Sequence, residues 1–355
     1  MGNAMKKPSW LAMLMVLFAL GCLFVGCEIM GAWQLKSMNV LGWESDRYLW
    51  MAGMTGVARW DVNEQIIVNR SFRPDGISHF FTSSEGQVWA YGDGIWLFDA
   101  GKWIKVSETA GLQQRLIHDM GQTADGTIWA ATWYGFKSWD QEIRLWESML
   151  VDRPGETLVQ GSDGSLWFGL AEDGVIRVQS GEFTYWTTAD GLVDNRIESM
   201  LAASDGTIWV GTRRGVSHWD ESGWQGWEHL GYPDPDGLVV YELYETRDGT
   251  IWAATSEDLA KWDGEEWATY QRSPSCFTVF TMLEDNDGNF WVGCIGGLFR
   301  WAESGWQEYG KSEGVFDNSY SRLIQGTNGI LYATTRSGKY QYAPEQDRWQ
   351  PFPNK

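Results

Sequence analysis

One stretch of the chain decides its fold, and it reads SDGTIWVGTRRGVSHWD at residues 204–220. The Asp-Gly pair at 205–206 suits a tight hairpin turn, because glycine accepts a positive φ. Residues 207–210, Thr-Ile-Trp-Val, are β-branched and aromatic and favour a strand. Gly215 turns the chain into a second strand, and Asp220 turns it again. Such a piece cannot bury its apolar face alone, so we expect neighbouring copies.

The copies are found by following the tryptophan of this unit along the chain. An aromatic residue recurs with spacings of 38 to 43 residues, at Trp50, Trp89, Trp129, Trp167, Trp209, Trp252, Trp291 and Tyr332. Nine residues before each of them stands an apolar residue, namely Leu41, Phe80, Met120, Leu158, Met200, Leu243, Met282 or Leu323. A sustained period near 40 indicates a repeat fold. All eight units pass this second check.

Each unit contains four short strands, which we name A to D in chain order, with the repeated aromatic residue on strand B. Four short strands in about 40 residues are typical of one blade of a β-propeller. The 42 glycines, which mark nearly every turn, argue against a helical repeat. We therefore predict that residues 38–355 form one all-β domain, a β-propeller of eight blades with four antiparallel strands each. A seven-bladed ring is the less favoured alternative. How the ring closes stays open, because residues 33–35 resemble residues 349–350.

Composition narrows the function classes. The 355 residues carry a net charge of −20, which excludes a nucleic-acid partner because phosphates require a basic surface. The 25 tryptophans follow the repeat and are expected to fill the space between blades, where aromatic burial dominates the energetics.

The N-terminus predicts export and membrane attachment. Lys6 and Lys7 precede an apolar run over residues 10–27, which is typical of a secretory signal and is also long enough for a membrane helix. The run ends in Phe-Val-Gly-Cys and resembles the lipobox of bacterial lipoproteins. That resemblance implies lipidation at Cys27 after cleavage. An uncleaved anchor and plain secretion are the alternatives. Residues 1–27 are thus a signal or anchor, residues 28–37 a tether, and the propeller is expected to be extracytoplasmic.

Two cysteines, Cys276 and Cys294, lie within the repeats. In an exported protein they could form a disulfide bond. They fall on neighbouring strands A and B, but counting across the hairpin at residues 287–288 leaves them about three residues out of register. Since disulfide geometry is strict, two buried free thiols are the other interpretation.

The unit Asp-Gly-x-Ile-Trp-Val-Gly-Thr-x-x-Gly-Val, intact at residues 205–216, resembles the two-component regulator propeller repeat. Looser copies occur at residues 125–136, 248–259 and 287–298, and residues 190–197 resemble that family's segment between blades. The resemblance implies an extracytoplasmic sensor module of the kind found in membrane histidine kinases that often respond to carbohydrates. This sequence shows neither a second hydrophobic span nor a kinase. The resemblance therefore supports the fold more strongly than a sensing role.

No pattern in the sequence indicates catalysis. The four histidines and the cysteines lack zinc-ligand spacing, so we expect no metal and no cofactor. Residues 310–314 match Gly-x-Ser-x-Gly, but they lie between strands rather than at a strand-to-helix elbow. Residues 285–289 look like part of a calcium loop, but they form the ordinary A–B hairpin of the repeat. No catalytic residue is therefore predicted.

Ligand binding is expected at one end of the blades. The A–B turns are nearly uniform, whereas the B–C and D–A connections vary, and alternation of the strands places both variable sets at the same end. Variable loops on a rigid scaffold are where binding usually occurs. The candidate ligand-binding residues at this end, each of which could also be an ordinary solvated side chain, are Trp133, Tyr134, Asn195, Arg196, Arg213, Arg214, Tyr241, Asn318, Arg322 and Arg336.

The leading hypothesis from the sequence is a membrane-anchored, non-enzymatic binding or sensor-like module. Its ligand would be a glycan or another small molecule, because arginine and aromatic groups together suit a sugar. The alternative is a lipoprotein scaffold that binds an envelope protein partner. A polysaccharide lyase is a third and less favoured hypothesis.

Overall fold

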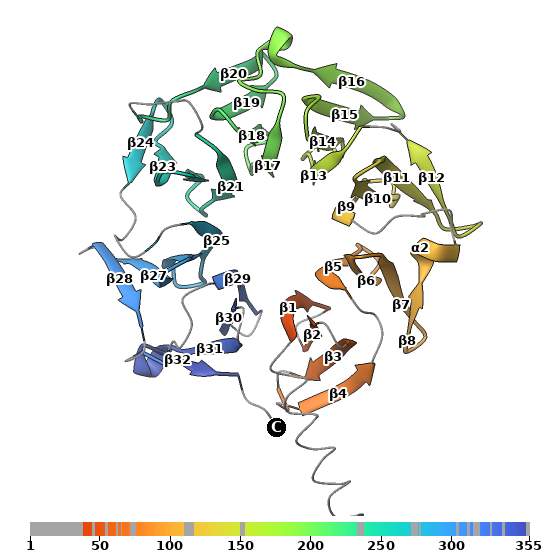
Figure 1. Ribbon diagram of the computed structural model, residues 1–355, viewed down its shortest axis with the longest axis vertical. Coiled ribbons are helices and arrows are strands. Elements are labelled where there is room, and N and C mark those ends of the chain that lie inside the picture. Colours follow the sequence, from red (N-terminus) through yellow and green to blue (C-terminus); the bar gives the residue numbers. More distant parts are fainter. Residues whose placement is uncertain are drawn as a thin grey trace, which may run out of the picture.

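The computed structural model describes residues 38–44, 47–53, 56–61, 63–64, 66–71, 76–109, 117–149, 153–232, 238–270, 276, 278–302, 305–310, 313–314, 320–326, 329–335 and 338–352. Within these residues the chain forms eight separate four-stranded antiparallel sheets, arranged as a ring (Figure 1). The predicted eight-bladed, all-β propeller is confirmed.

Each blade is one continuous segment whose strands A to D run from the centre of the ring to its outer edge (Figure 1). The first four blades are β1 Met38–Trp43, β2 Tyr48–Gly53, β3 Gly56–Asp61 and β4 Ile66–Ser71; β5 Ile77–Thr82, β6 Val88–Gly92, β7 Ile95–Asp99 and β8 Lys102–Lys105; β9 Ile117–Gln122, β10 Ile128–Thr132, β11 Gly135–Asp140 and β12 Leu145–Met149; β13 Gly155–Gln160, β14 Leu166–Leu170, β15 Val175–Gln179 and β16 Glu182–Trp186.

The other four blades follow the same order. They are β17 Ile197–Ala202, β18 Ile208–Thr212, β19 Val216–Asp220 and β20 Gly223–Trp227; β21 Val240–Glu245, β22 Ile251–Thr255, β23 Leu259–Trp262 and β24 Trp267–Tyr270; β25 Val279–Glu284, β26 Phe290–Cys294, β27 Gly297–Ala302 and β28 Gly305–Tyr309; β29 Tyr320–Gln325, β30 Leu331–Thr335, β31 Lys339–Ala343 and β32 Arg348–Pro351. One helical turn, α2 (Val106–Thr109), follows β8, and two short 3-10 turns span Thr188–Asp190 and Pro344–Gln346.

Strand B carries the core of each blade. From blade two to blade eight, all five residues of this strand are buried. The strand is buried on both faces because each sheet packs between two others. Its β-branched, aromatic and small residues suit a pleated surface without a solvent side.

Indoles fill the space between neighbouring blades. The ring of Trp209 in blade five, for example, lies 5.7 Å from the ring of Trp262 and 5.8 Å from that of Trp267 in blade six. Two residues further along strand B, a small residue is required. A Cβ on Gly211 would lie 2.8 Å from Cγ1 of Val240, so only glycine lets blade six approach this closely.

Blades eight and one meet without exchanging a strand. All four strands of blade eight come from residues 320–351. After β32, the ring of Phe352 packs 4.9 Å from Trp60 of blade one and 5.7 Å from Tyr332 of blade eight. The described chain ends thus close the ring through aromatic packing.

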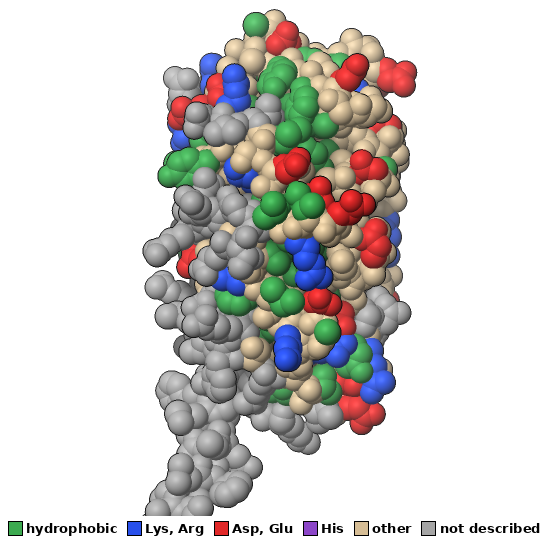
Figure 2. Space-filling view, turned by 90° about the vertical axis from the view of Figure 1, so that its right-hand side faces the viewer, with side chains coloured by type: hydrophobic (Ala, Val, Ile, Leu, Met, Phe, Trp, Pro, Cys, Tyr) green, Lys and Arg blue, Asp and Glu red, His purple; other side chains and the backbone are tan. Residues whose placement is uncertain are grey.

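The outer edge of the ring is mixed in character. Figure 2 shows hydrophobic side chains interrupted by acidic and basic ones, with acidic groups frequent toward the right of the view. Residues 1–37 lie outside the described part of the chain, so the signal or anchor, the tether and lipidation at Cys27 stay predictions. In the described part, no helix is long and apolar enough to cross a membrane.

Candidate functional site

The B–C and D–A connections lie at one end of the ring, which we call the loop end. Trp133 and Tyr134 occupy the B–C turn of blade three, and Arg213 and Arg214 that of blade five. Asn195 and Arg196 precede β17 in the D–A connection. Two predicted loop residues belong to strands instead, since Tyr241 lies in β21 and Arg322 in β29. Asn318 and Arg336 lie outside the described residues.

A β-bulge at the start of strand A shapes the loop end of each blade. In blade five, Ile197 faces Thr212 and Ser199 faces Gly211, which leaves Glu198 between them without a partner of its own. The same register shift occurs in the other blades. Bulges re-aim side chains and are frequent beside functional sites. The described bulge residues are Ser78, His118, Glu156, Glu198, Tyr241 and Phe280.

Aromatic and charged groups share this end of the ring. Tyr241 and Phe280, the bulge residues of two successive blades, are 43% and 44% exposed. Trp133 and Tyr134 are each 51% exposed. The ring of His118 lies 5.8 Å from that of Trp133. Exposed aromatic faces of this kind offer stacking surfaces to a ligand.

The predicted arginines of blade five are held by carboxylates of their own blade. Arg213 Nε pairs with Glu198, and the hydrogen bond to this carboxylate is the largest cause that raises the pKa of Arg213. Arg214 Nη2 lies 3.4 Å from Glu228 Oε2. Both side chains remain largely exposed, so a ligand could still reach them.

Asn195 has a structural role in its loop. Its Oδ1 accepts a hydrogen bond of 2.8 Å from the backbone N–H of Thr188, and its carbonyl accepts one from Gly174. Arg196 is exposed beside it. The sequence could not show that Asn195 stabilises the loop whereas Arg196 is exposed, because asparagine occurs both in turns and in binding sites.

The residue after each bulge forms a second layer near the axis of the ring. Asp119 of blade three accepts hydrogen bonds from the Tyr91 hydroxyl of blade two (3.2 Å) and from the Leu158 N–H of blade four (3.0 Å). In the same register, Thr281 accepts a hydrogen bond from the Leu323 N–H of the next blade, at 3.2 Å. This layer therefore joins neighbouring blades as well as lining the axis.

Arg322 brings several of these groups together from different blades. Its charge acts on His79 and Tyr91 of blade two, Asp119 of blade three and Glu242 of blade six. We call these five residues the axial cluster. Sequence reasoning found only Arg322. A sequence pattern could have indicated the other members of the cluster, because a polar residue stands directly before the repeated apolar residue of strand A in seven of the eight units. These polar residues are His79, Asp119, Thr157, Ser199, Glu242, Thr281 and Arg322.

Burial sets the protonation of the axial cluster. It raises the pKa of Glu242 to about 8, against the opposing effects of the Met282 N–H and Arg322. Desolvation, followed by the charge of Arg322, lowers the pKa of His79 to about 4. Near neutral pH, Glu242 is therefore largely protonated and His79 is neutral, which leaves Arg322 as a cation among polar neighbours.

Two buried polar atoms of the axial cluster lack a partner in the part of the chain that the structure describes. They are Nη1 of Arg322 and Oε2 of Glu242. Buried polar atoms in proteins are nearly always hydrogen-bonded to protein, water or ligand. These two atoms therefore have capacity to bond a water or another polar molecule.

Cys276 and Cys294 form a disulfide bond, with their Cα atoms 5.7 Å apart. The expected register offset is also present, because Cys294 faces Val279 rather than Cys276. The bond forms because Cys276 precedes the strand and lies outside the ladder. Counting along a regular hairpin could not show this. No cluster of metal-ligating side chains occurs in the described segments.

The carboxylate of the calcium-like loop is engaged by protein donors. Asp285 accepts hydrogen bonds from the backbone N–H of Asp287 and Asn289, from the amide side chain of Asn289 and from Trp291 Nε1. The loop is thus the A–B turn expected from the repeat.

Comparison with known proteins finds that a family model matches two segments of the chain. The two component regulator propeller family matches residues 191–214 and 273–296. The chain carries two-component regulator propeller repeats. This confirms the resemblance seen in the repeat unit. No curated protein matches the chain.

Solved structures share the fold at low sequence identity. The computationally designed Ika8 protein has a TM-score of 0.62 at 11% identity, covering 89% of this chain and 95% of its own. Virginiamycin B lyase from Staphylococcus aureus, solved with quinupristin, has a TM-score of 0.54 at 13% identity, covering 74% and 92%.

A longer relative is the extracellular domain of a hybrid two component system from B. thetaiotaomicron. It has a TM-score of 0.49 at 14% identity, covering 88% of this chain and 46% of that domain. The chain thus spans about half the length of that structure. Identities at this level show the fold alone.

Proposed function

We propose that this propeller is an extracytoplasmic, non-enzymatic ligand-binding module of the sensor type, which holds its ligand at the loop end above the axial cluster. The observation that carries the proposal is the pair of buried, unpartnered atoms, Arg322 Nη1 and Glu242 Oε2. A ligand that supplies their missing hydrogen bonds would be favoured, since such atoms are costly to leave unbonded.

A glycan is the ligand class that fits best. A sugar ring presents hydroxyl groups, which can accept hydrogen bonds from Arg322 and from the protonated carboxyl group of Glu242. It also presents C–H faces, which can pack on the exposed rings of Tyr241, Phe280 or Trp133. The family repeat supports a sensor-type module, in which binding rather than catalysis is the task.

The test is a glycan-array screen of the full chain in mild detergent, followed by the shift of Tm for each hit. A ligand that prefers the folded state raises Tm. Tyr241→Ala and Arg322→Lys should weaken retention of the hit. Tyr185→Ala removes a comparably exposed tyrosine from the outer strand β16 and should leave retention unchanged.

The results separate the proposal from its alternatives. Absence of binding across neutral and acidic glycans would contradict the glycan proposal, and crosslinking to an envelope protein in intact cells would then favour a scaffold. Turnover of a bound polysaccharide would contradict the non-enzymatic role. Membrane attachment is tested separately, because Cys27→Ser should release a lipoprotein from the membrane fraction.

A further inference from the structure

A repeated pair of aromatic residues fills the wedge between blades. In seven blades, the strand C residue that follows the partner of the repeated strand B aromatic residue is itself aromatic, namely Trp60, Phe98, Trp139, Trp219, Trp262, Trp301 or Tyr342. In six of these blades its partner on strand D is also a tryptophan, namely Trp103, Trp146, Trp224, Trp267, Trp306 or Trp349. The repeat therefore usually places two large rings against the preceding blade.

Blade four breaks this rule. Val178 stands at the strand C position and pairs with Phe183 on strand D. A side chain much smaller than an indole thus faces Trp129 of blade three. Because protein interiors are close-packed, a missing ring must leave space unless the neighbours collapse.

The neighbours fill only part of this space, where the ring of Phe168 on strand B packs 5.4 Å from that of Trp129. A cavity of about 360 Å³ lies between blades three and four, and its apolar wall consists of Trp129, Met149, Val178 and Phe183. It opens at the A–B and C–D turns, which is the end of the ring opposite the loop end. Depressions of about 620 and 580 Å³ lie between blades two and three and between blades four and five, but with the indoles of Trp139 and Trp219 in place their walls carry fewer apolar side chains.

The rim of the cavity is acidic. Asp125 and Asp163 line it, and none of its lining residues is a lysine or an arginine. The hydrogen bond from the Thr123 hydroxyl is the largest cause that lowers the pKa of Asp125. For Asp163, burial is outweighed by hydrogen bonds from Ser165 and Arg177, so its pKa is also lowered. Both carboxylates are ionised near neutral pH, although Arg177 already offsets the charge of Asp163.

We propose that this cavity binds an organic cation that carries an aromatic ring of about the size of an indole. The ring would occupy the space that Val178 leaves, against Trp129 and Phe183. The cationic group would lie near Asp125 at the rim. Aromatic walls next to a carboxylate favour such cations, whereas the same rim and the net charge of −20 repel anions. This site is independent of the loop-end site.

The test uses tryptamine as the probe, with binding to the full chain measured by calorimetry and by saturation-transfer NMR. Indole-3-acetate, which has the same ring and the opposite charge, should bind at least about tenfold more weakly than tryptamine. Val178→Trp should fill the cavity and weaken tryptamine binding by about tenfold or more. Tyr185→Trp adds an indole to the outer strand of the same blade and should leave binding unchanged.

Asp125→Asn tests whether the carboxylate at the rim attracts the cationic group of the ligand, and it leaves the residues of the core unchanged. It should weaken tryptamine binding about threefold, as expected for a partly exposed ion pair. Asp248→Asn is the matched control, because Asp248 accepts the same threonine hydroxyl and backbone N–H hydrogen bonds in the A–B turn of blade six. It should leave binding unchanged.

Three results would overturn the proposal. The first is no binding of tryptamine to the wild-type chain. The second is equal binding to the wild type and to a folded Val178→Trp variant, with folding checked by circular dichroism. The third is equal binding of tryptamine and indole-3-acetate. If Val178→Trp fails to fold, the Asp125→Asn and Asp248→Asn pair decides, since equal affinities for these two variants would also contradict the site.

Discussion

The interface between blades seven and eight is filled, whereas the interface between blades three and four keeps a cavity. Between blades seven and eight, the ring of Trp291 lies 4.9 Å from Tyr342 and 5.6 Å from Trp349, and Trp349 is fully buried. Between blades three and four, the equivalent positions on strands C and D hold Val178 and Phe183. The same repeat thus yields a rigid contact in one place and a cavity in another.

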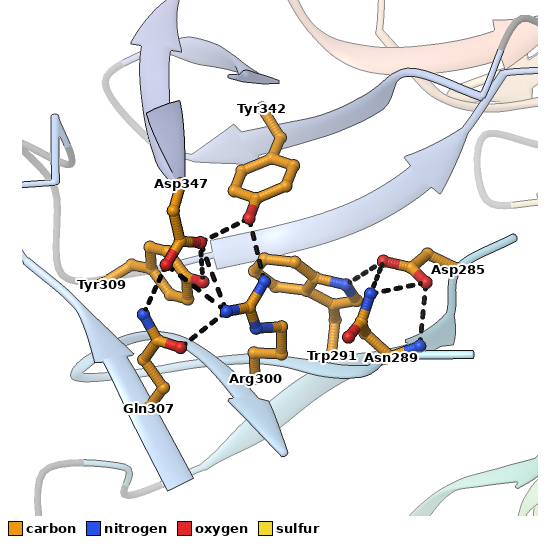
Figure 3. Close-up of polar contacts among 8 residues, drawn as sticks. All are labelled: Asp285, Asn289, Trp291, Arg300, Gln307, Tyr309, Tyr342 and Asp347. Atoms are coloured by element: carbon orange, nitrogen blue, oxygen red, sulfur yellow. Dashed lines mark hydrogen bonds and ion pairs between the residues drawn. The ribbon is translucent and has the colours of Figure 1, made fainter. Parts of the chain in front are cut away.

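A polar network adds to the filled interface (Figure 3). The carboxylate of Asp347 accepts hydrogen bonds from the Tyr309 and Tyr342 hydroxyls at 2.6 and 2.5 Å and from Gln307 Nε2 at 3.0 Å. Arg300 donates to the Tyr342 hydroxyl at 2.9 Å and to Gln307 Oε1 at 2.6 Å. These bonds join strands C and D of blade seven to the C–D turn of blade eight. The difference teaches that stability and binding capacity are distributed unequally around a ring of similar blades.

The largest expected effect is that of Trp291→Ala. This side chain is 0% exposed and packs against three rings of the filled interface, so we expect a loss of about 3–5 kcal/mol in the free energy of unfolding. Trp129→Ala, beside the cavity, should cost at least about 1 kcal/mol less, because one side of its ring already borders free space. Urea denaturation measures both. Equal losses would contradict the comparison.

Asp347→Asn should destabilise the filled interface by about 1–2 kcal/mol, because charged hydrogen bonds to two hydroxyls become neutral ones. Asparagine also tolerates the positive φ of 47° at this position. Glu345→Gln, on an exposed side chain of the same turn, is the control and should change little. A loss as small as that of the control would show that the network contributes nothing to stability.

Val178→Trp should raise the free energy of unfolding by about 1 kcal/mol, as is usual when a cavity is filled. The added indole restores the residue type that strand C carries in five other blades. The measurement is again urea denaturation, with Tyr185→Trp as the control for an added surface indole. A clear loss of stability would mean that the space between blades three and four is not shaped for this ring.

The smallest expected effect is on acid stability. Burial alone would raise the pKa of Asp347, but hydrogen bonds from Tyr309, Tyr342 and Gln307 lower it to about 2. Its unfolded value is about 4. The charged form therefore favours folding, and this contribution is complete above about pH 4 and is lost as the pH falls toward 2. The stability difference between wild type and Asp347→Asn should shrink in this window, whereas a difference that stays constant would contradict the assignment.

The fold could be predicted from the sequence because the repeat consists of residues with strong local preferences for turns or for strands. The Asp-Gly turns and the strand B that follows each of them correspond to observed features. The sequence also predicted the end of the ring at which Trp133, Tyr134 and Tyr241 are exposed. These features depend on neighbours in the chain, or on contacts that repeat identically from blade to blade.

The rest of the candidate site depends on contacts between distant segments. The axial cluster joins blades two, three, six and eight, and a sequence pattern gives no distance between them. The Cys276–Cys294 bond was left open because the path of the chain before a strand cannot be counted. The cavity at Val178 was not predicted, because the space left by a smaller side chain depends on how the neighbouring blades pack.

The closure through Phe352 also sets how the ring should yield to force. If the two ends are pulled apart, the aromatic contact with Trp60 carries the load first, and the ring opens before any blade is lost. Blades would then peel away from the ends, each releasing about 40 residues, or roughly 130 Å of chain. Blade seven should give a shorter step, because the Cys276–Cys294 bond withholds the 18 residues that it spans. Reducing that bond would lengthen this step by roughly 60 Å and match it to the steps of the other blades.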